Sequence, residues 1–125
     1  MNYRQRDIVE LNVELNDGKM IPVLGLVISD NSRMENFGNP VTVFRVSKDI
    51  SAFNPAYHRM LEESFMQSPL ETQAYLTTGM ESFYDWGKRI TKVVNRMSYE
   101  EFERTLAWAT GLIGHKWLWI ASPIV

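Results

Sequence analysis

Apolar and polar residues alternate along the start of the chain. In the segment DIVELNVEL (7–15), every second residue from Val9 to Leu15 is apolar, and the residues between them are acidic or amide residues. A period of two is typical of a strand with one buried face. An Asp-Gly pair within the polar stretch 16–19 favours a tight turn. The almost unbroken apolar run VLGLVI (23–28) is typical of a strand covered on both faces. The pattern therefore predicts a β-hairpin over 7–29.

The next segments continue this β pattern. Residues 30–40 (DNSRMENFGNP) are rich in Asn, Asp, Ser, Gly and Pro, which predicts a surface loop. Residues 41–46 (VTVFRV) alternate again and predict a third strand.

Three helix-start signals lie in the second half of the chain. The pair Asn54-Pro55 predicts a short amphipathic helix to about residue 67. The stretch 68–71 (SPLE) has the pattern of a capping box, and a helically spaced apolar stripe after it predicts a long helix to about residue 94. A third capping box at 98–101 (SYEE) predicts a helix to Gly114, followed by a buried strand at 117–120 (WLWI). The expected fold class is α+β, with a small bent antiparallel sheet packed against about three helices.

Length and charge limit the classes of function. With 125 residues, 45% of them hydrophobic, the chain is expected to form a single domain over 1–125. It has 13 basic and 15 acidic side chains, so any nucleic-acid site must be a local patch. The absence of cysteine excludes disulfides, cysteine-based zinc sites and a thiol nucleophile. The polar N-terminus lacks the apolar core of a signal peptide, which predicts a cytoplasmic protein.

The apolar stretch 106–125 approaches the length of a membrane span. Two glycines and its only ionisable residues, His115 and Lys116, lie near its centre, where a charge is most costly. A buried helix end followed by a strand is the favoured interpretation, and no membrane association is expected.

The N-terminal third resembles the opening of the PemK/MazF family of bacterial toxins. Those proteins begin with a strand of the type G-D-I-V and a turn. A strand of the type R-P-A-L-V-I-S follows, and the next strand ends in Thr or Ser. The counterparts here are DIV (7–9), the turn 17–19, Pro22 with LVIS (26–29), and the segment 41–47. The resemblance covers about the first 47 residues.

The resemblance implies an SH3-like barrel and a metal-independent endoribonuclease that cuts single-stranded RNA. It further implies a homodimer, an antitoxin or other protein partner, and no cofactor. The sequence departs from the family at two positions. The family's catalytic arginine precedes the proline, where this chain has Ile21, and its leading glycine is Arg6. The family's catalytic hydroxyl falls on Ser47.

RNA cleavage without a metal ion requires a base for the 2′-hydroxyl proton and a cation or donors near the phosphate. Isoleucine supplies neither. Replacement cations would come from Lys19, Arg45 or Lys48, which flank the same edge of the predicted hairpin. Arg45 and Ser47 are therefore the candidate catalytic residues, Lys19 and Lys48 are the candidate RNA-binding residues, and no metal ligand is proposed.

Each candidate also has an ordinary structural explanation. A serine at a strand end commonly caps a turn, and an arginine on a half-exposed strand is commonly solvated. Two functions from different classes therefore stay open, and with them whether the chain is an enzyme. One is a toxin-like ribonuclease. The other is a non-catalytic protein-interaction module on the same scaffold, which Ile21 favours. Whether Lys19, Arg45 and Ser47 converge in space is the observation that discriminates best.

Overall fold

The structure is a computed structural model, which describes residues 2–85, 89–114 and 118–121. The strands are β1 (Asp7–Glu14), β2 (Met20–Val27), β3 (Pro40–Ser47), β4 (Arg59–Met60), β5 (Tyr75–Tyr84) and β6 (Ile90–Arg96). The α-helices are α1 (Asn31–Asn36), α2 (Tyr99–Ile113) and the short α3 (Leu118–Ala121). Two 3-10 turns, Ile50–Ala52 and Glu63–Phe65, lie in the segment between β3 and β5.

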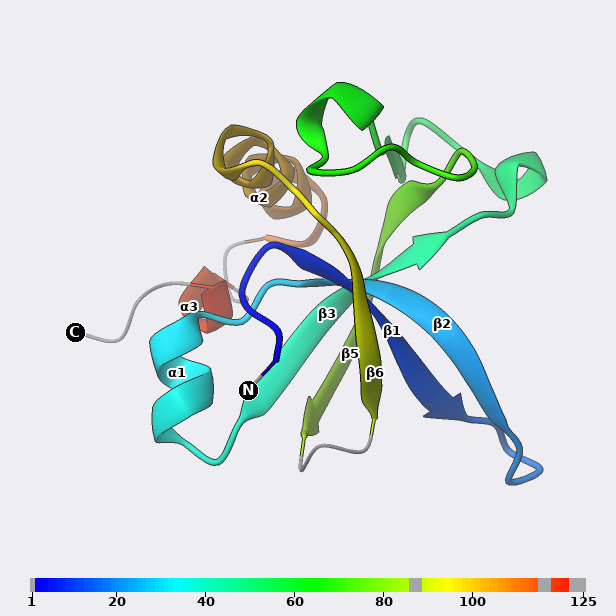
Figure 1. The fold of residues 1–125 in the computed structure, drawn as a ribbon. Helices are drawn as coiled ribbons and strands as arrows, with labels where there is room; N and C mark the ends of the chain where they lie inside the picture. Colours follow the sequence, from blue (N-terminus) through cyan, green and yellow to red (C-terminus); the bar gives the residue numbers. More distant parts are fainter. Residues whose placement is uncertain (1, 86–88, 115–117, 122–125) are drawn as a thin grey trace.

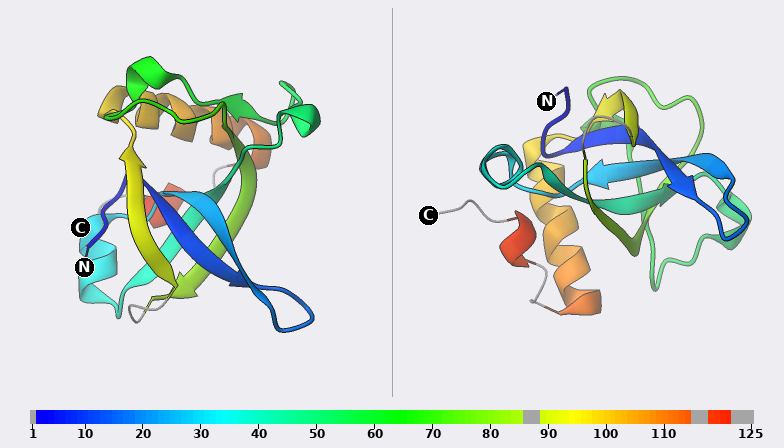
Figure 2. Two further views of the ribbon diagram at one scale, coloured as in Figure 1. Left: turned by 45° about the vertical axis from the view of Figure 1, so that its right-hand side comes forward. Right: turned by 90° about the horizontal axis from the view of Figure 1, so that it is seen from below.

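The six strands form one antiparallel sheet in the order β4-β5-β3-β2-β1-β6 (Figure 1). β5 and β6 follow each other in sequence, yet three strands separate them in the sheet. Phe83 of β5 and Ile90 of β6 nevertheless pack against the same buried cluster. The sheet therefore curls until its two sides approach each other, which gives the half-barrel seen in Figures 1 and 2.

The predicted hairpin over 7–29 is confirmed. β1 and β2 pair in register from Ile8 opposite Leu26 to Glu14 opposite Met20. In the turn, Gly18 adopts a φ of 85°, which L side chains rarely adopt. The Asp17 carboxylate accepts a hydrogen bond from the backbone N–H of Lys19 at 3.0 Å. The Asp-Gly pair thus acts as the sequence indicates.

Two hydrophobic cores lie on the two faces of the curled sheet. Val9, Val27 and Val43 belong to the cluster inside the curl. Their neighbours along the same strands, such as Ile8 and Phe44, belong to the cluster that contains residues of α2. Both faces of the central strands are buried, which explains why the run 23–28 is apolar at almost every position. The third predicted strand, 41–46, is confirmed by β3.

Two of the predicted helices are wrong. Asn54 starts a single turn, in which its side chain accepts a hydrogen bond from the N–H of Ala56, and the turn ends at His58. The chain then enters β4. The capping-box pattern at 68–71 is not a helix start, because the backbone of Ser68 is bound on both sides by the Asn95 amide. In place of the expected long helix over 68–94, the described residues form the two strands β5 and β6, and residues 86–88 of that prediction lie outside the described ranges.

The third predicted helix is confirmed as α2. The Ser98 hydroxyl accepts a hydrogen bond from the N–H of Glu101 at 3.2 Å, and Gly114 ends the helix with a φ of 86°. The Glu101 side chain does not complete the capping box. It is buried and binds Arg59 with an N–O distance of 3.1 Å, which joins β4 to α2.

Two further segments differ from the prediction. Within the predicted loop 30–40, Asp30 caps the short helix α1 by accepting hydrogen bonds from the N–H groups of Ser32 and Arg33. The predicted final strand 117–120 is wrong over 118–120, because Leu118–Ala121 is the helix α3. Trp117 lies outside the described residues. Within its described residues, the C-terminal half therefore contributes two α-helices and not three. No helix within the described ranges is both long and apolar enough to cross a membrane.

Candidate functional site

An irregularity in the sheet marks the C-terminal end of β3. Phe44 pairs with Met80 and Val46 pairs with Leu76, so the three β5 residues 77–79 lie opposite the single residue Arg45. The Thr77 hydroxyl donates a hydrogen bond to the Arg45 carbonyl oxygen at 3.2 Å. Bulges redirect side chains and are common beside active sites. The irregularity therefore places Arg45 in a backbone setting unlike that of the rest of β3.

A cavity of about 720 Å³, which we call the β3-end hollow, opens beside this irregularity. It lies where β1, β2, β3 and β5 contribute to one depression. Its lining residues are Glu10, Pro22, Val23, Leu24, Arg45, Val46, Ser47, Lys48, Asp49 and Thr77.

The structure brings three of the four sequence candidates together. Arg45, Ser47 and Lys48 all line the β3-end hollow. Lys19 lies at the tip of the β1–β2 hairpin and is not among the lining residues. Ile21, at the family's arginine position, does not line the hollow either. The cations available to a ligand here are therefore Arg45 and Lys48.

These three side chains differ in their partners. The Arg45 guanidinium lies 3.0 Å from the Glu81 carboxylate, and both side chains are about one-third exposed. Solvent-exposed pairs of this kind contribute about 0–1 kcal/mol, so an incoming anion can replace Glu81. The Ser47 hydroxyl oxygen accepts a hydrogen bond from the N–H of Asp49 at 3.1 Å. Lys48 is exposed and makes no salt bridge with the residues that the structure describes.

Two carboxylates in the hollow were not singled out from the sequence. Asp49 follows β3, and its carboxylate accepts a hydrogen bond from the Ser51 hydroxyl at 2.6 Å. Glu10 comes from β1, where it lies in register with Leu24, which is in register with Val46. Neighbouring strands lie about 4.8 Å apart, so the backbones of Glu10 and Val46 are about 10 Å apart across the sheet. The alternation in β1 places Glu10 on the polar face, but only the strand order brings it to β3.

The hollow combines the groups that metal-free phosphodiester chemistry uses. Glu10 and Asp49 are candidate bases, Arg45 and Lys48 are cations, and Ser47 carries a hydroxyl. With two cations and two carboxylates, the hollow is not a basic patch. Among the described residues, no cluster of three or more His, Asp or Glu side chains is arranged to hold a metal ion.

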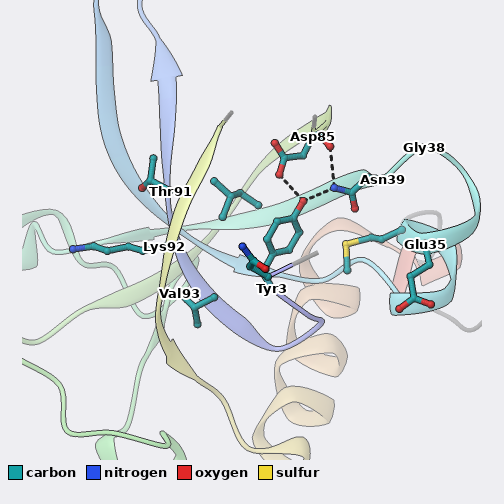
Figure 3. Close-up of a pocket in the computed structure, with 11 residues that line it drawn as sticks. Tyr3, Glu35, Gly38, Asn39, Asp85, Thr91, Lys92 and Val93 are labelled. Carbon is teal, nitrogen blue, oxygen red and sulfur yellow. Dashed lines mark hydrogen bonds between the residues drawn. The ribbon is translucent and has the colours of Figure 1, made fainter. Parts of the chain in front are cut away.

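A second polar cluster lies at the opposite end of the sheet, where Tyr3 occupies the opening of the curl (Figure 3). Its hydroxyl donates to the Asp85 carboxylate at 2.5 Å and accepts from the Asn39 amide at 2.6 Å. The same Asn39 amide also donates to the Asp85 carbonyl oxygen at 2.9 Å. Figure 3 shows the three side chains pointing toward one another, whereas Lys92 extends away from them.

This cluster has a structural role. Burial raises the pKa of the Tyr3 hydroxyl, the hydrogen bond to Asp85 raises it further, and the hydrogen bond from Asn39 opposes the shift. Tyr3 therefore stays protonated over the physiological pH range. Its contacts join the N-terminal segment to Asn39, just before β3, and to Asp85, just after β5, which lie far along the chain from each other. We assign this cluster to closing the end of the half-barrel.

Comparison with family models and with curated proteins found no match to this chain.

Proposed function

We propose that this chain is a PemK/MazF-like protein that binds single-stranded RNA in the β3-end hollow and cleaves it without a metal ion. One observation carries the proposal: Arg45, Ser47 and Lys48, which the sequence alone singles out, line the same cavity. The curled antiparallel sheet supports the kinship, because an SH3-like barrel with one side left open would have this form.

In the proposed reaction, the Glu10 carboxylate takes the proton from a 2′-hydroxyl group of the RNA. The 2′ oxygen then attacks the adjacent phosphorus and forms a 2′,3′-cyclic phosphate. The 5′ oxygen of the next nucleotide leaves and takes a proton from solvent. Arg45, released from Glu81, and Lys48 stabilise the charge that develops on the phosphate, and the Ser47 hydroxyl donates to it. Arg45 and Lys48 thereby replace the cation that Ile21 cannot supply.

A cleavage assay tests this mechanism. Purified protein is incubated with single-stranded RNA in the presence of EDTA, and the products are analysed for 2′,3′-cyclic phosphate ends. Glu10→Gln and Arg45→Gln should each lower the cleavage rate about 10²-fold or more. Asp49→Asn is the matched control, because it neutralises the other carboxylate of the hollow, and it should change the rate only a few-fold. Equal losses for Glu10→Gln and Asp49→Asn would contradict the assignment of the base.

The proposal extends to growth and partners. Expression in a bacterium should slow growth, and Ser47→Ala should relieve the effect. The resemblance also suggests a homodimer and an antitoxin partner. Light scattering of the purified protein tests the dimer, and copurification from the native host tests the partner.

A second candidate function is a non-catalytic protein-interaction module. It is favoured by an apolar cavity of about 490 Å³ beside α1, lined in part by Phe37, Pro40 and Tyr84. Phe37 and Tyr84 are 57% and 59% exposed and line the same cavity. Adjoining exposed apolar side chains commonly mark an interaction surface. On this alternative, wild-type protein would neither cleave RNA in EDTA nor slow growth. Phe37→Ser would then abolish capture of the protein partner.

A further inference from the structure

A second cavity of about 320 Å³ adjoins the β3-end hollow. The two cavities share Glu10, Leu24, Val46 and Lys48. A ligand held at Lys48 in the first cavity would therefore reach the second one without leaving the protein surface. We call the second cavity the side hollow.

The side hollow has fixed walls. Its outer wall is the segment 61–74, in which the N–H of Leu61 donates to the Ala74 carbonyl oxygen at 3.0 Å. The Asn95 side chain makes two hydrogen bonds of 3.0 Å with the backbone of Ser68. Leu61 and Ala74 are themselves buried in the core. The wall is therefore attached at both ends, and the cavity is formed before any ligand arrives.

The chemistry of the side hollow matches one kind of ligand. Leu24, Leu61 and Leu70 give it apolar surfaces, while Thr72 and Glu71 place a hydroxyl and a carboxylate at its rim. A flat ligand with apolar faces and polar edges satisfies both parts. An unpaired nucleobase has this form, and flipped bases are commonly held between apolar side chains with hydrogen bonds to their edges.

We infer that the side hollow binds a single unpaired base of an RNA strand whose phosphate lies against Lys48. The inference rests on the proposed RNA function and adds to it a specific base contact. Lys48 lines both cavities, so it would lie between the bound phosphate and the base. The volume of the side hollow, about 320 Å³, also lies within the range of ordinary ligand pockets.

An abasic scan tests the inference. Binding of a short, fluorescently labelled single-stranded RNA is measured by anisotropy, and each nucleotide in turn is replaced by an abasic one. At one position, loss of the base should weaken wild-type binding about tenfold. Leu70→Ser should weaken binding of the intact RNA by a similar factor. This variant should then bind the abasic RNA and the intact RNA with equal affinity. Leu112→Ser, at an exposed position of α2, is the matched control and should bind like the wild type.

Thr72→Phe provides a second variant in case Leu70→Ser misfolds, which circular dichroism would reveal. The added ring should block the side hollow and produce the same insensitivity to the abasic position. If each variant binds the abasic RNA more weakly than the intact RNA, by the same factor as the wild type does, the base lies elsewhere and the inference is overturned. If wild-type protein binds no RNA at all, the proposed function fails and the inference fails with it.

Discussion

Gly25 shows how a single residue permits the curl of the sheet. A Cβ atom at this position would lie 2.7 Å from Cγ2 and 2.8 Å from Cβ of Val43, on the neighbouring strand. Real Cβ atoms do not approach side chains this closely. Gly25 therefore lets β2 approach the buried side of β3 more closely than any other residue would.

Gly25→Ala should lower the free energy of unfolding by about 1–3 kcal/mol, because the added methyl group overfills a packed core. Urea denaturation of both proteins measures the change. Gly111→Ala is the matched control, since a Cβ at Gly111 in α2 meets nothing within 4 Å. It should stabilise the protein by about 0.5–1 kcal/mol. Similar effects for both variants would contradict the assigned role of Gly25.

The Tyr3 cluster gives a prediction about pH. Tyr3→Phe removes the donor to the buried Asp85 carboxylate and should lower the free energy of unfolding at pH 7 by about 1–3 kcal/mol. The pKa of the folded-state Tyr3 hydroxyl lies above its ordinary value of 10.0. The stabilisation is therefore fully present below pH 10 and is lost as the pH rises further. Above pH 10, the advantage of the wild type should shrink by about 1.4 kcal/mol per pH unit.

Urea denaturation of both proteins at intervals from pH 7 to pH 11 measures this difference. The comparison with Tyr3→Phe cancels the titration of the remaining tyrosines and lysines. A difference that stays constant above pH 10 would show that the Tyr3 hydroxyl titrates normally in the folded protein.

At the scale of elements, the start of α2 depends on Ser98, the N-cap residue that precedes it. The Ser98 hydroxyl satisfies one of the free N–H groups at the start of the helix. Ser98→Ala should lower the free energy of unfolding by about 1 kcal/mol. Thermal unfolding followed by circular dichroism measures the loss. Ser32→Ala, at an exposed position within α1, serves as the control and should change stability by less than about 0.5 kcal/mol.

Local patterns predicted the elements whose signals lie within a few residues. The hairpin is specified by alternation on each side of an Asp-Gly turn, and α2 is specified by the Ser98 cap and by Gly114 at its end. Both signals act through backbone groups nearby in sequence. The hairpin and the helix can therefore be predicted from these signals without knowing what each element packs against.

The same reasoning failed for β5 and β6, because spacing alone does not distinguish a helical face from two strands. Leu76 and Met80 fit one helical stripe, yet Leu76 is buried and Met80 is 43% exposed. The β-branched pairs Thr77-Thr78 and Val93-Val94 favour strands, and they are the local signal that was outweighed. What decides the matter is pairing with β3 and β1, which lie far away in sequence.

At the scale of the whole molecule, some residues of the candidate site follow from the local sequence and others only from the strand order. Arg45, Ser47 and Lys48 lie within four consecutive residues, so a strand end brings them together regardless of the rest of the fold. Glu10 and Thr77 reach the hollow only through the strand order β5-β3-β2-β1 and the irregularity opposite Arg45. No local pattern contains that order. The cations of the site were therefore predictable, whereas its carboxylate from β1 was not.

If RNA binds in the β3-end hollow, two lysines should differ in their contribution to RNA binding. Lys48 lines the hollow, whereas Lys19 lies at the hairpin tip outside it. Lys48→Gln and Lys19→Gln remove the same charge, so an effect of net charge alone would be equal in the two variants. Binding of single-stranded RNA is measured for each variant across a range of salt concentrations.

Lys48→Gln should weaken binding and lower the slope of log K against log salt concentration by about 0.7, the loss of one phosphate contact. Lys19→Gln should leave both the affinity and the slope at wild-type values. Equal losses for the two variants would mean that RNA is held by general charge alone and would contradict the account.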